Sequence, residues 1–244
     1  MTTGKSNWKG YDRYDFEVSG REAIVVCPKR ASPGNPWIWR AEFFDAFAQA
    51  DMALLEQGYH LAYYMVSDMY GCPEAIELMH GFQEKAEEEF NLSAKTVLFG
   101  FSRGGLYSVN YAATYPDRVA ALYLDAPVLD LGSWPGGKGK KTESASEWAE
   151  CLRCYGMTDE QFVHFKGNPL DRAEELAEFG IPIILVAGDA DDLVPYADNG
   201  EILASRYREH GGVIEVILKP GIGHHPHSLE DPSPIVDFIL KHSK

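Results

Sequence analysis

The feature that most constrains the fold of this chain is the sequence TVLFGFSRGG at residues 96–105. Residues 96–99 are a short apolar run that predicts a strand, and residues 103–115 predict a helix. Ser102 lies two positions after Gly100 and two positions before Gly104. Glycines at these positions allow the backbone to turn sharply while the serine adopts a strained conformation. The pattern therefore predicts a strand–turn–helix unit with Ser102 at its apex.

Predicted strands and helices alternate along most of the chain. A hairpin of two strands, at residues 14–18 and 23–27, comes first. Further strands are expected at residues 59–66, 96–99, 119–124, 183–187 and 213–218, and helices at residues 42–57, 73–90, 103–115, 171–179, 200–210 and 234–242. This order predicts an α/β fold in one domain over residues 1–244. We expect a doubly wound, mostly parallel sheet with an antiparallel N-terminal hairpin and helices on both faces.

The segment from about residue 127 to about residue 170 interrupts this alternation. Residues 130–142 are rich in glycine, and residues 144–165 predict two short helices. The segment follows the carboxyl end of a strand, where sheets of this kind bind their ligands. We therefore expect it to form a small cap over a site.

Candidate partners for Ser102 follow the last two predicted strands. A serine hydroxyl is a weak nucleophile, so it needs a histidine to take its proton and an acid to orient that histidine. The aspartates available after residues 183–187 are Asp189, Asp191 and Asp192. The histidines available after residues 213–218 are His224, His225 and His227. Three histidines so close together can also bind a metal ion, but carboxylates at tight spacing are missing, so we expect no metal and no cofactor.

These features occur in an order that is typical of one family. Gly-x-Ser-x-Gly at residues 100–104, Gly-x-x-Asp-x-x-Val-Pro at residues 188–195 and Gly-His at residues 223–224 each follow a strand. On these motifs the chain resembles the α/β-hydrolase family over nearly its whole length. The segments SWPGGKG at residues 133–139 and GHHPH at residues 223–227 look most similar to small esterase-like members, namely acetylxylan esterases and prolyl-oligopeptidase-like catalytic domains.

The resemblance implies a catalytic triad. Ser102 would be the nucleophile, His224 the base and Asp191 the acid, with Asp192 as the second choice for the acid. Asp189 is instead expected to hydrogen-bond within its own turn. His225 and His227 remain alternatives to His224 or supporting groups.

One departure from the family pattern concerns the oxyanion hole, the pair of N–H groups that would stabilise a developing negative charge. The N–H of Arg103 is expected to be one donor. The usual His-Gly-Gly loop is missing, and residues 28–40 stand in its place. We expect the second donor there, with Trp37 and Ile38 as candidates.

By resemblance the reaction is carboxylic-ester hydrolysis, and we expect a short-acyl esterase that acts on an acetylated carbohydrate. The alternatives are a prolyl-oligopeptidase-like peptidase and a non-catalytic binding protein on the same scaffold. Aromatic side chains suit sugar rings, although tryptophans are also common in protein cores. Candidate substrate contacts are Trp39, Arg40, Asp68, Tyr70, Trp134 and His225, and a basic group at Lys138, Lys140 and Lys141 suits an anionic substrate.

Composition restricts the partners and the compartment. The net charge of −15 disfavours nucleic acid and anionic membranes, because both repel an acidic surface. The first nine residues are polar, so no secretion signal is visible and we expect a cytoplasmic protein. The four cysteines are predicted to be free thiols, Cys151-x-x-Cys154 included. The expected partner is a small-molecule or oligosaccharide ester, and the oligomeric state is not predicted.

Overall fold

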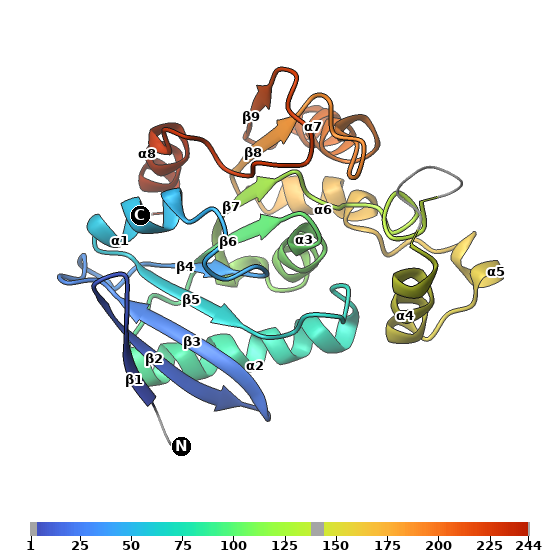
Figure 1. Ribbon diagram of the computed structural model, residues 1–244. Helices are drawn as coiled ribbons and strands as arrows, with labels where there is room; N and C mark the ends of the chain where they lie inside the picture. The colour runs from blue at the N-terminus through green and yellow to red at the C-terminus, as the bar shows by residue number, and fades with distance from the viewer. Residues whose placement is uncertain (1–3, 138–143, 244) are drawn as a thin grey trace.

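In the computed structural model, which describes residues 4–137 and 144–243, one sheet runs through the whole molecule (Figure 1). Its order in the described residues is β1-β2-β3-β5-β4-β6-β7-β8-β9. The pairs β1–β2, β2–β3 and β3–β5 are antiparallel, and every later pair is parallel. The strands are β1 (Gly4–Trp8), β2 (Tyr11–Val18), β3 (Arg21–Cys27), β4 (Trp37–Arg40), β5 (His60–Tyr64), β6 (Thr96–Phe101), β7 (Val119–Asp125), β8 (Ile183–Gly188) and β9 (Ile214–Lys219). The predicted α/β class, with its mostly parallel sheet and N-terminal hairpin, is therefore confirmed.

Helices cover both faces of this sheet. The helices are α1 (Gln49–Glu56), α2 (Pro73–Phe90), α3 (Gly104–Thr114), α4 (Ala145–Tyr155), α5 (Asp159–Phe162), α6 (Ala173–Glu178), α7 (Gly200–Glu209) and α8 (Ser233–His242). Helices α1 and α8 pack on one face, and α2, α3, α6 and α7 pack on the other (Figure 1).

Alternating side chains of the central strands divide between these two cores. In β6, Leu98 joins the core under α2 and α3, whereas Val97 and Phe99 join the core under α1 and α8. Because successive strand residues point to opposite faces, an apolar run such as this fits a strand with a helix layer on each side.

Two expectations about the first third of the chain are wrong. Residues 37–40, which are expected from the sequence to belong to the loop region that replaces His-Gly-Gly, form β4 in the middle of the sheet, between β5 and β6. Residues 42–48 are not helical, since helix α1 begins only at Gln49. Phe43, Asp45 and Phe47 have positive φ angles, which a helix cannot contain.

Helices α4 and α5 lie at one end of the molecule, beyond the carboxyl ends of the parallel strands (Figure 1). Hydrogen bonds join α4 to the loop after β5: Tyr70 donates to Glu150 at 2.9 Å, and Tyr155 donates to the carbonyl of Tyr70 at the same distance. The Sγ of Cys154 donates to the carbonyl of Asp68 at 3.3 Å. The segment at residues 144–165 is thereby held against the edge of the sheet where Ser102 lies.

Candidate active site

Ser102 lies in the sharp turn between β6 and α3. Its φ angle is 49°, in the left-handed region that non-glycine residues rarely adopt. The neighbouring glycines allow this close turn. A Cβ atom on Gly100 would lie 2.9 Å from side chains of Leu124 and Ser108, and one on Gly105 would lie 2.7 Å from Pro127 and from the carbonyl of Val128. The backbone therefore holds the serine hydroxyl at the apex of the turn, as the sequence predicts.

The structure brings Ser102, His224 and Asp191 together from three separate loops. The Nε2 atom of His224 lies 2.9 Å from Oγ of Ser102, although 122 positions separate the two residues. The Nδ1 atom of His224 lies 2.7 Å from Oδ2 of Asp191. Since an ionised carboxylate only accepts hydrogen bonds, Nδ1 carries the proton and Nε2 is free to accept the proton of Ser102. This chain of hydrogen bonds has the connectivity of a nucleophile, a base and an orienting acid.

Asp191 is held as an anion by its surroundings. Burial alone would raise the pKa of Asp191, but the hydrogen bond from His224 and the N–H groups of Val194 and Leu193 hold this pKa below its ordinary value. These N–H groups lie 2.8 Å and 2.9 Å from Oδ1. An ionised Asp191 would stabilise the positive charge that His224 acquires when it takes a proton.

The other two aspartates of this loop are arranged differently. Asp189 accepts a hydrogen bond from the N–H of Gly221 at 2.6 Å, so it joins the loop after β8 to the loop after β9. Asp192 is exposed. Of the three candidates, Asp191 is the one that contacts His224.

A second imidazole–carboxylate pair lies next to the first. The Nδ1 atom of His227 lies 2.7 Å from Oδ1 of Asp125, at the end of β7, and both side chains are buried. Oδ2 of Asp125 accepts hydrogen bonds from the hydroxyl of Tyr123 at 2.7 Å and from the N–H of Ser228 at 2.8 Å. The sequence analysis missed Asp125. Its only signal in the sequence is a carboxylate directly after an apolar strand.

The oxyanion-hole candidates in β4 must be corrected. Trp37 and Ile38 lie within β4 and are at most 1% exposed. Trp37 is paired to β5, and Ile38 is paired to both β5 and β6, so both residues are in the sheet and not at the site. The segment that follows β4 lies beside Gly104, in the turn that carries Ser102. The amide nitrogen of Glu42 is 3.7 Å from the position of a Cβ on Gly104. Among the residues that the structure describes, the N–H groups of Arg103, Glu42 and Phe43 donate to no acceptor.

Three of the predicted substrate contacts are also wrong. Trp39 and Arg40 are fully buried in β4, and Tyr70 is 1% exposed. Arg40 forms a buried ion pair with Asp51, with Nε 2.7 Å from Oδ1. A buried guanidinium requires a partner of opposite charge, and the sequence alone does not indicate that Asp51 is the partner of Arg40.

The remaining predicted contacts lie at or near the site. His225 is exposed beside His224, Asp68 is exposed, and Trp134 is partly buried with its ring 6.0 Å from that of Tyr70. Lys138, Lys140 and Lys141 lie outside the described residues.

The Arg103 side chain joins two acidic groups beside Ser102. Its guanidinium lies 3.5 Å from Asp68 and 3.6 Å from Glu42. Glu42 is buried, and its Oε2 accepts a hydrogen bond from Ser67 at 3.0 Å. Burial raises the pKa of Glu42, although nearby Arg103 lowers it in part.

Comparison with known proteins agrees with this architecture. A family model described as "alpha/beta hydrolase fold" matches residues 78–165, which include β6, the turn at Ser102, α3 and β7. Solved structures match almost the whole chain at TM-scores above 0.6. The chain has the α/β-hydrolase fold. No curated protein matches it in a sequence search.

Solved structures with the α/β-hydrolase fold include lipases, esterases and peptidases. A putative lipase from Acinetobacter baumannii is 15% identical with a TM-score of 0.64, and the match covers 95% of this chain and 92% of the lipase. Est1E from Butyrivibrio proteoclasticus is 17% identical with a TM-score of 0.63, and 98% of each chain is covered. Dipeptidyl peptidase 4 from Porphyromonas gingivalis is 14% identical with a TM-score of 0.71, but the match covers 95% of this chain and only 35% of the peptidase.

No helix in residues 4–137 and 144–243 has both the length and the hydrophobicity of a membrane span.

Proposed function

We propose that the protein is a serine hydrolase that cleaves carboxylic esters through Ser102, His224 and Asp191. The observation that carries this proposal is the continuous chain of hydrogen bonds from Oγ of Ser102 to Nε2 of His224, and from Nδ1 of His224 to Asp191. The strained backbone of Ser102 supports the same role, because strain of this kind clusters at functional sites.

The reaction would proceed in two halves. Oγ of Ser102 attacks the ester carbonyl carbon while its proton passes to Nε2 of His224. The tetrahedral intermediate collapses, the alkoxide takes the proton from His224 and leaves, and the acyl group stays on Ser102. A water molecule then attacks the carbonyl carbon of the acyl-enzyme and gives its proton to Nε2 of His224. The second tetrahedral intermediate collapses, Oγ of Ser102 leaves and takes that proton back from His224, and the carboxylic acid is released.

The oxyanion of each tetrahedral intermediate would be stabilised by backbone N–H groups. Arg103 supplies one of them, since its N–H has no acceptor in the described part of the chain and directly follows the nucleophile. The segment Glu42–Phe43 supplies the second, since it lies beside the turn and its N–H groups are equally available.

A short acyl group suits the surroundings of Ser102. Arg103, Asp68 and Glu42 place charged groups directly beside the serine, and a long hydrocarbon chain would have to desolvate them. The solved structures of esterases and peptidases are less than 25% identical to this chain, and they support the fold alone. The proposal of an acetylated carbohydrate as the substrate is based on the resemblance of the sequence motifs.

The test is covalent labelling combined with a substrate series. The protein would be treated with a fluorophosphonate, the adduct mapped by mass spectrometry, and the rates measured on 4-nitrophenyl acetate, butyrate and octanoate. An adduct on Ser102 with acetate preferred supports the proposal. Labelling of Ser102 with cleavage of peptide amides and no ester turnover would indicate a peptidase. No adduct and no turnover would contradict a serine hydrolase.

A further inference from the structure

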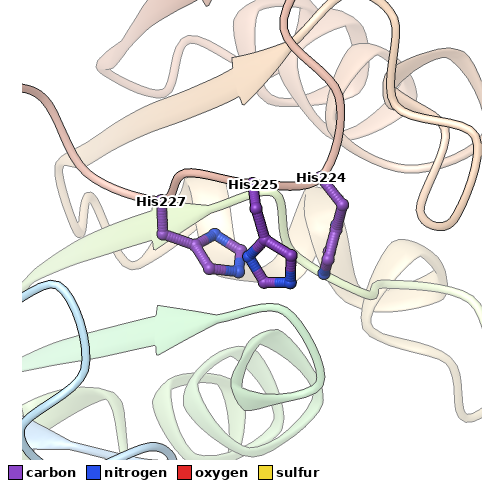
Figure 2. Close-up of side chains that lie close together, drawn as sticks. All are labelled: His224, His225 and His227. Atoms are coloured by element: carbon purple, nitrogen blue, oxygen red, sulfur yellow. The ribbon is translucent and has the colours of Figure 1, made fainter.

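Three imidazole rings lie together on the loop that follows β9. His224, His225 and His227 each place a ring nitrogen within 4.8 Å of the others, and their ring centroids are 4.8–4.9 Å apart. Figure 2 shows the three rings side by side on the same side of the loop. The triad uses one of these imidazoles, so the clustering of the other two beside it needs a separate explanation.

Two of the three histidines have a carboxylate behind them. Nδ1 of His224 donates to Asp191 and Nδ1 of His227 donates to Asp125, each at 2.7 Å. These bonds assign the proton of the neutral imidazole to Nδ1, which leaves Nε2 as the nitrogen with the lone pair in both rings. Histidines that bind metal ions commonly donate their other ring nitrogen to a carboxylate in this way, which orients the ring and makes the ligand more basic.

We infer that His224, His225 and His227 bind one Zn²⁺ ion through their Nε2 atoms, and that the bound ion inhibits the enzyme. The inhibition rests on the proposed function, because Nε2 of His224 would be both the base for Ser102 and a zinc ligand. Zinc would then be a regulator of the site and not a cofactor of the reaction.

The geometry allows this site with a small adjustment. Two imidazoles on a tetrahedral zinc ion have nitrogens about 3.4 Å apart, from Zn–N bonds of about 2.0–2.1 Å. One nitrogen from each ring lies within 4.8 Å of the others, so the ring nitrogens must approach one another by up to about 1.4 Å. His225 is the exposed ring of the three, and outside the cluster its ring stacks on Phe47 at a centroid distance of 5.8 Å, so we expect it to move most.

The charges around the cluster favour a cation. Asp191 and Asp125 lie directly behind two of the rings, and the whole chain carries a net charge of −15.

The experiment measures zinc binding and activity separately. Protein dialysed against EDTA would be titrated with ZnCl₂ by calorimetry at pH 7.5, for the wild type, His225→Ala and His164→Ala. His164 is an exposed histidine outside the cluster and serves as the control. We expect one zinc ion per chain in the wild type, affinity at least about 10-fold weaker in His225→Ala, and no change in His164→Ala. Binding should also weaken at pH 5.5, because protons compete for the imidazoles.

Activity on 4-nitrophenyl acetate would be expressed relative to the zinc-free rate of each protein. Zinc should inhibit the wild type and His164→Ala reversibly, with recovery on addition of EDTA, and should inhibit His225→Ala only at concentrations at least about 10-fold higher. Ser102→Ala should still bind zinc, so a failure of the proposed hydrolase activity would leave the binding result intact. Absence of stoichiometric binding, or binding unaffected by His225→Ala in a protein that keeps its melting temperature, would overturn the site. Binding without inhibition would overturn its regulatory role.

Discussion

Nδ1 of His227 lies 2.7 Å from Oδ1 of Asp125, and this contact attaches the loop that carries His224 to the end of β7. The same carboxylate accepts a hydrogen bond from the N–H of Ser228. Two consecutive loop residues, His227 and Ser228, are therefore bound to the end of β7. His224 is three positions away, with its ring 4.8 Å from that of His227. The position of His224 over Ser102 therefore depends on a carboxylate outside the proposed triad.

Replacing Asp125 by asparagine should weaken this attachment. An amide group would place a donor where the carboxylate accepts, and a lost hydrogen bond to a charged group costs about 1.5–3 kcal/mol of stability. We expect a lower melting temperature and a fall in kcat of about 10-fold, far less than the loss of a triad member. Asp117→Asn, at an exposed position, is the control for both measurements. An unchanged kcat would show that His224 is positioned without Asp125.

Replacing Ser102 by alanine should remove ester hydrolysis and fluorophosphonate labelling together. The expected loss in kcat is at least about 10³-fold, because removing the nucleophile leaves only binding and the oxyanion hole. The variant should remain folded, since Ser102 is at a surface turn and alanine is smaller than serine. Circular dichroism and steady-state kinetics would check these two outcomes. Full turnover in the variant would rule out the serine mechanism.

The two aspartates at 189 and 191 should respond differently to amidation. Asp191→Asn should lower kcat by about 10²–10⁴-fold, because an amide cannot stabilise the charged imidazole or fix its tautomer. Asp189→Asn should change kcat much less and lower the melting temperature, since Asp189 accepts a hydrogen bond from the N–H of Gly221 and so joins two loops. Measured on the same substrate, the opposite order would assign the acid to Asp189.

The residues of the proposed triad could be predicted because each lies in a local motif after its own strand. Asp191 and His224 follow β8 and β9, and strands that are neighbours in a parallel sheet bring their carboxyl ends to the same edge. Asp125 and His227 could not be paired in advance. Their contact spans 102 positions and depends on which strand lies beside β6, which local sequence does not encode.

Strand β4 was missed for a related reason. Its four residues, Trp37–Arg40, are buried on both faces, so they show no alternation between polar and apolar side chains. In the sequence, Arg40 suggests an exposed position because arginine is charged. In the structure, Asp51 neutralises Arg40, which allows it to be buried. Residues 42–48 have the composition of a helix, but positive φ angles at Phe43, Asp45 and Phe47 fold them into a compact loop. Tertiary contacts there outweigh intrinsic propensity.

Replacing Glu42 by glutamine should stabilise the protein at neutral pH but not at acidic pH. Burial raises the pKa of Glu42 in the folded state, so folding favours the protonated form. The contribution of protonated Glu42 to the free energy of unfolding is fully present below the ordinary pKa of 4.5. It is lost as the pH rises through the raised pKa of Glu42 in the folded state. Glutamine cannot ionise and avoids the loss.

Melting temperatures from pH 4 to pH 8 would test this. The melting temperature of Glu42→Gln should increasingly exceed that of the wild type as the pH rises. The difference should grow by about 2–4 °C for each kcal/mol of unfolding free energy that the wild type loses. Glu17→Gln, at an exposed position in β2, should show no such trend. A difference that is constant with pH would contradict a titrating Glu42.

A methyl group on Gly188 should displace the loop that carries His224. The Cβ would lie 2.1 Å from the carbonyl oxygen of Ile222 and 2.5 Å from that of Gly223, and both atoms are backbone. Gly188→Ala should therefore lower both the melting temperature and kcat. Gly81→Ala is the matched control, because nothing lies within 4 Å of its Cβ position in α2, and there alanine should add about 0.5–1 kcal/mol of stability. Normal kcat in Gly188→Ala would show that the loop adapts.

Because 122 positions lie between Ser102 and His224, the two residues are also synthesised at different times. At about 5–20 residues per second, a ribosome adds His224 roughly 6–24 seconds after Ser102. Throughout that interval the growing chain carries the serine without the imidazole that would activate it. In the proposed mechanism the unfinished polypeptide lacks its base, so hydrolysis would begin only once the strand that precedes the histidine loop has joined the edge of the sheet.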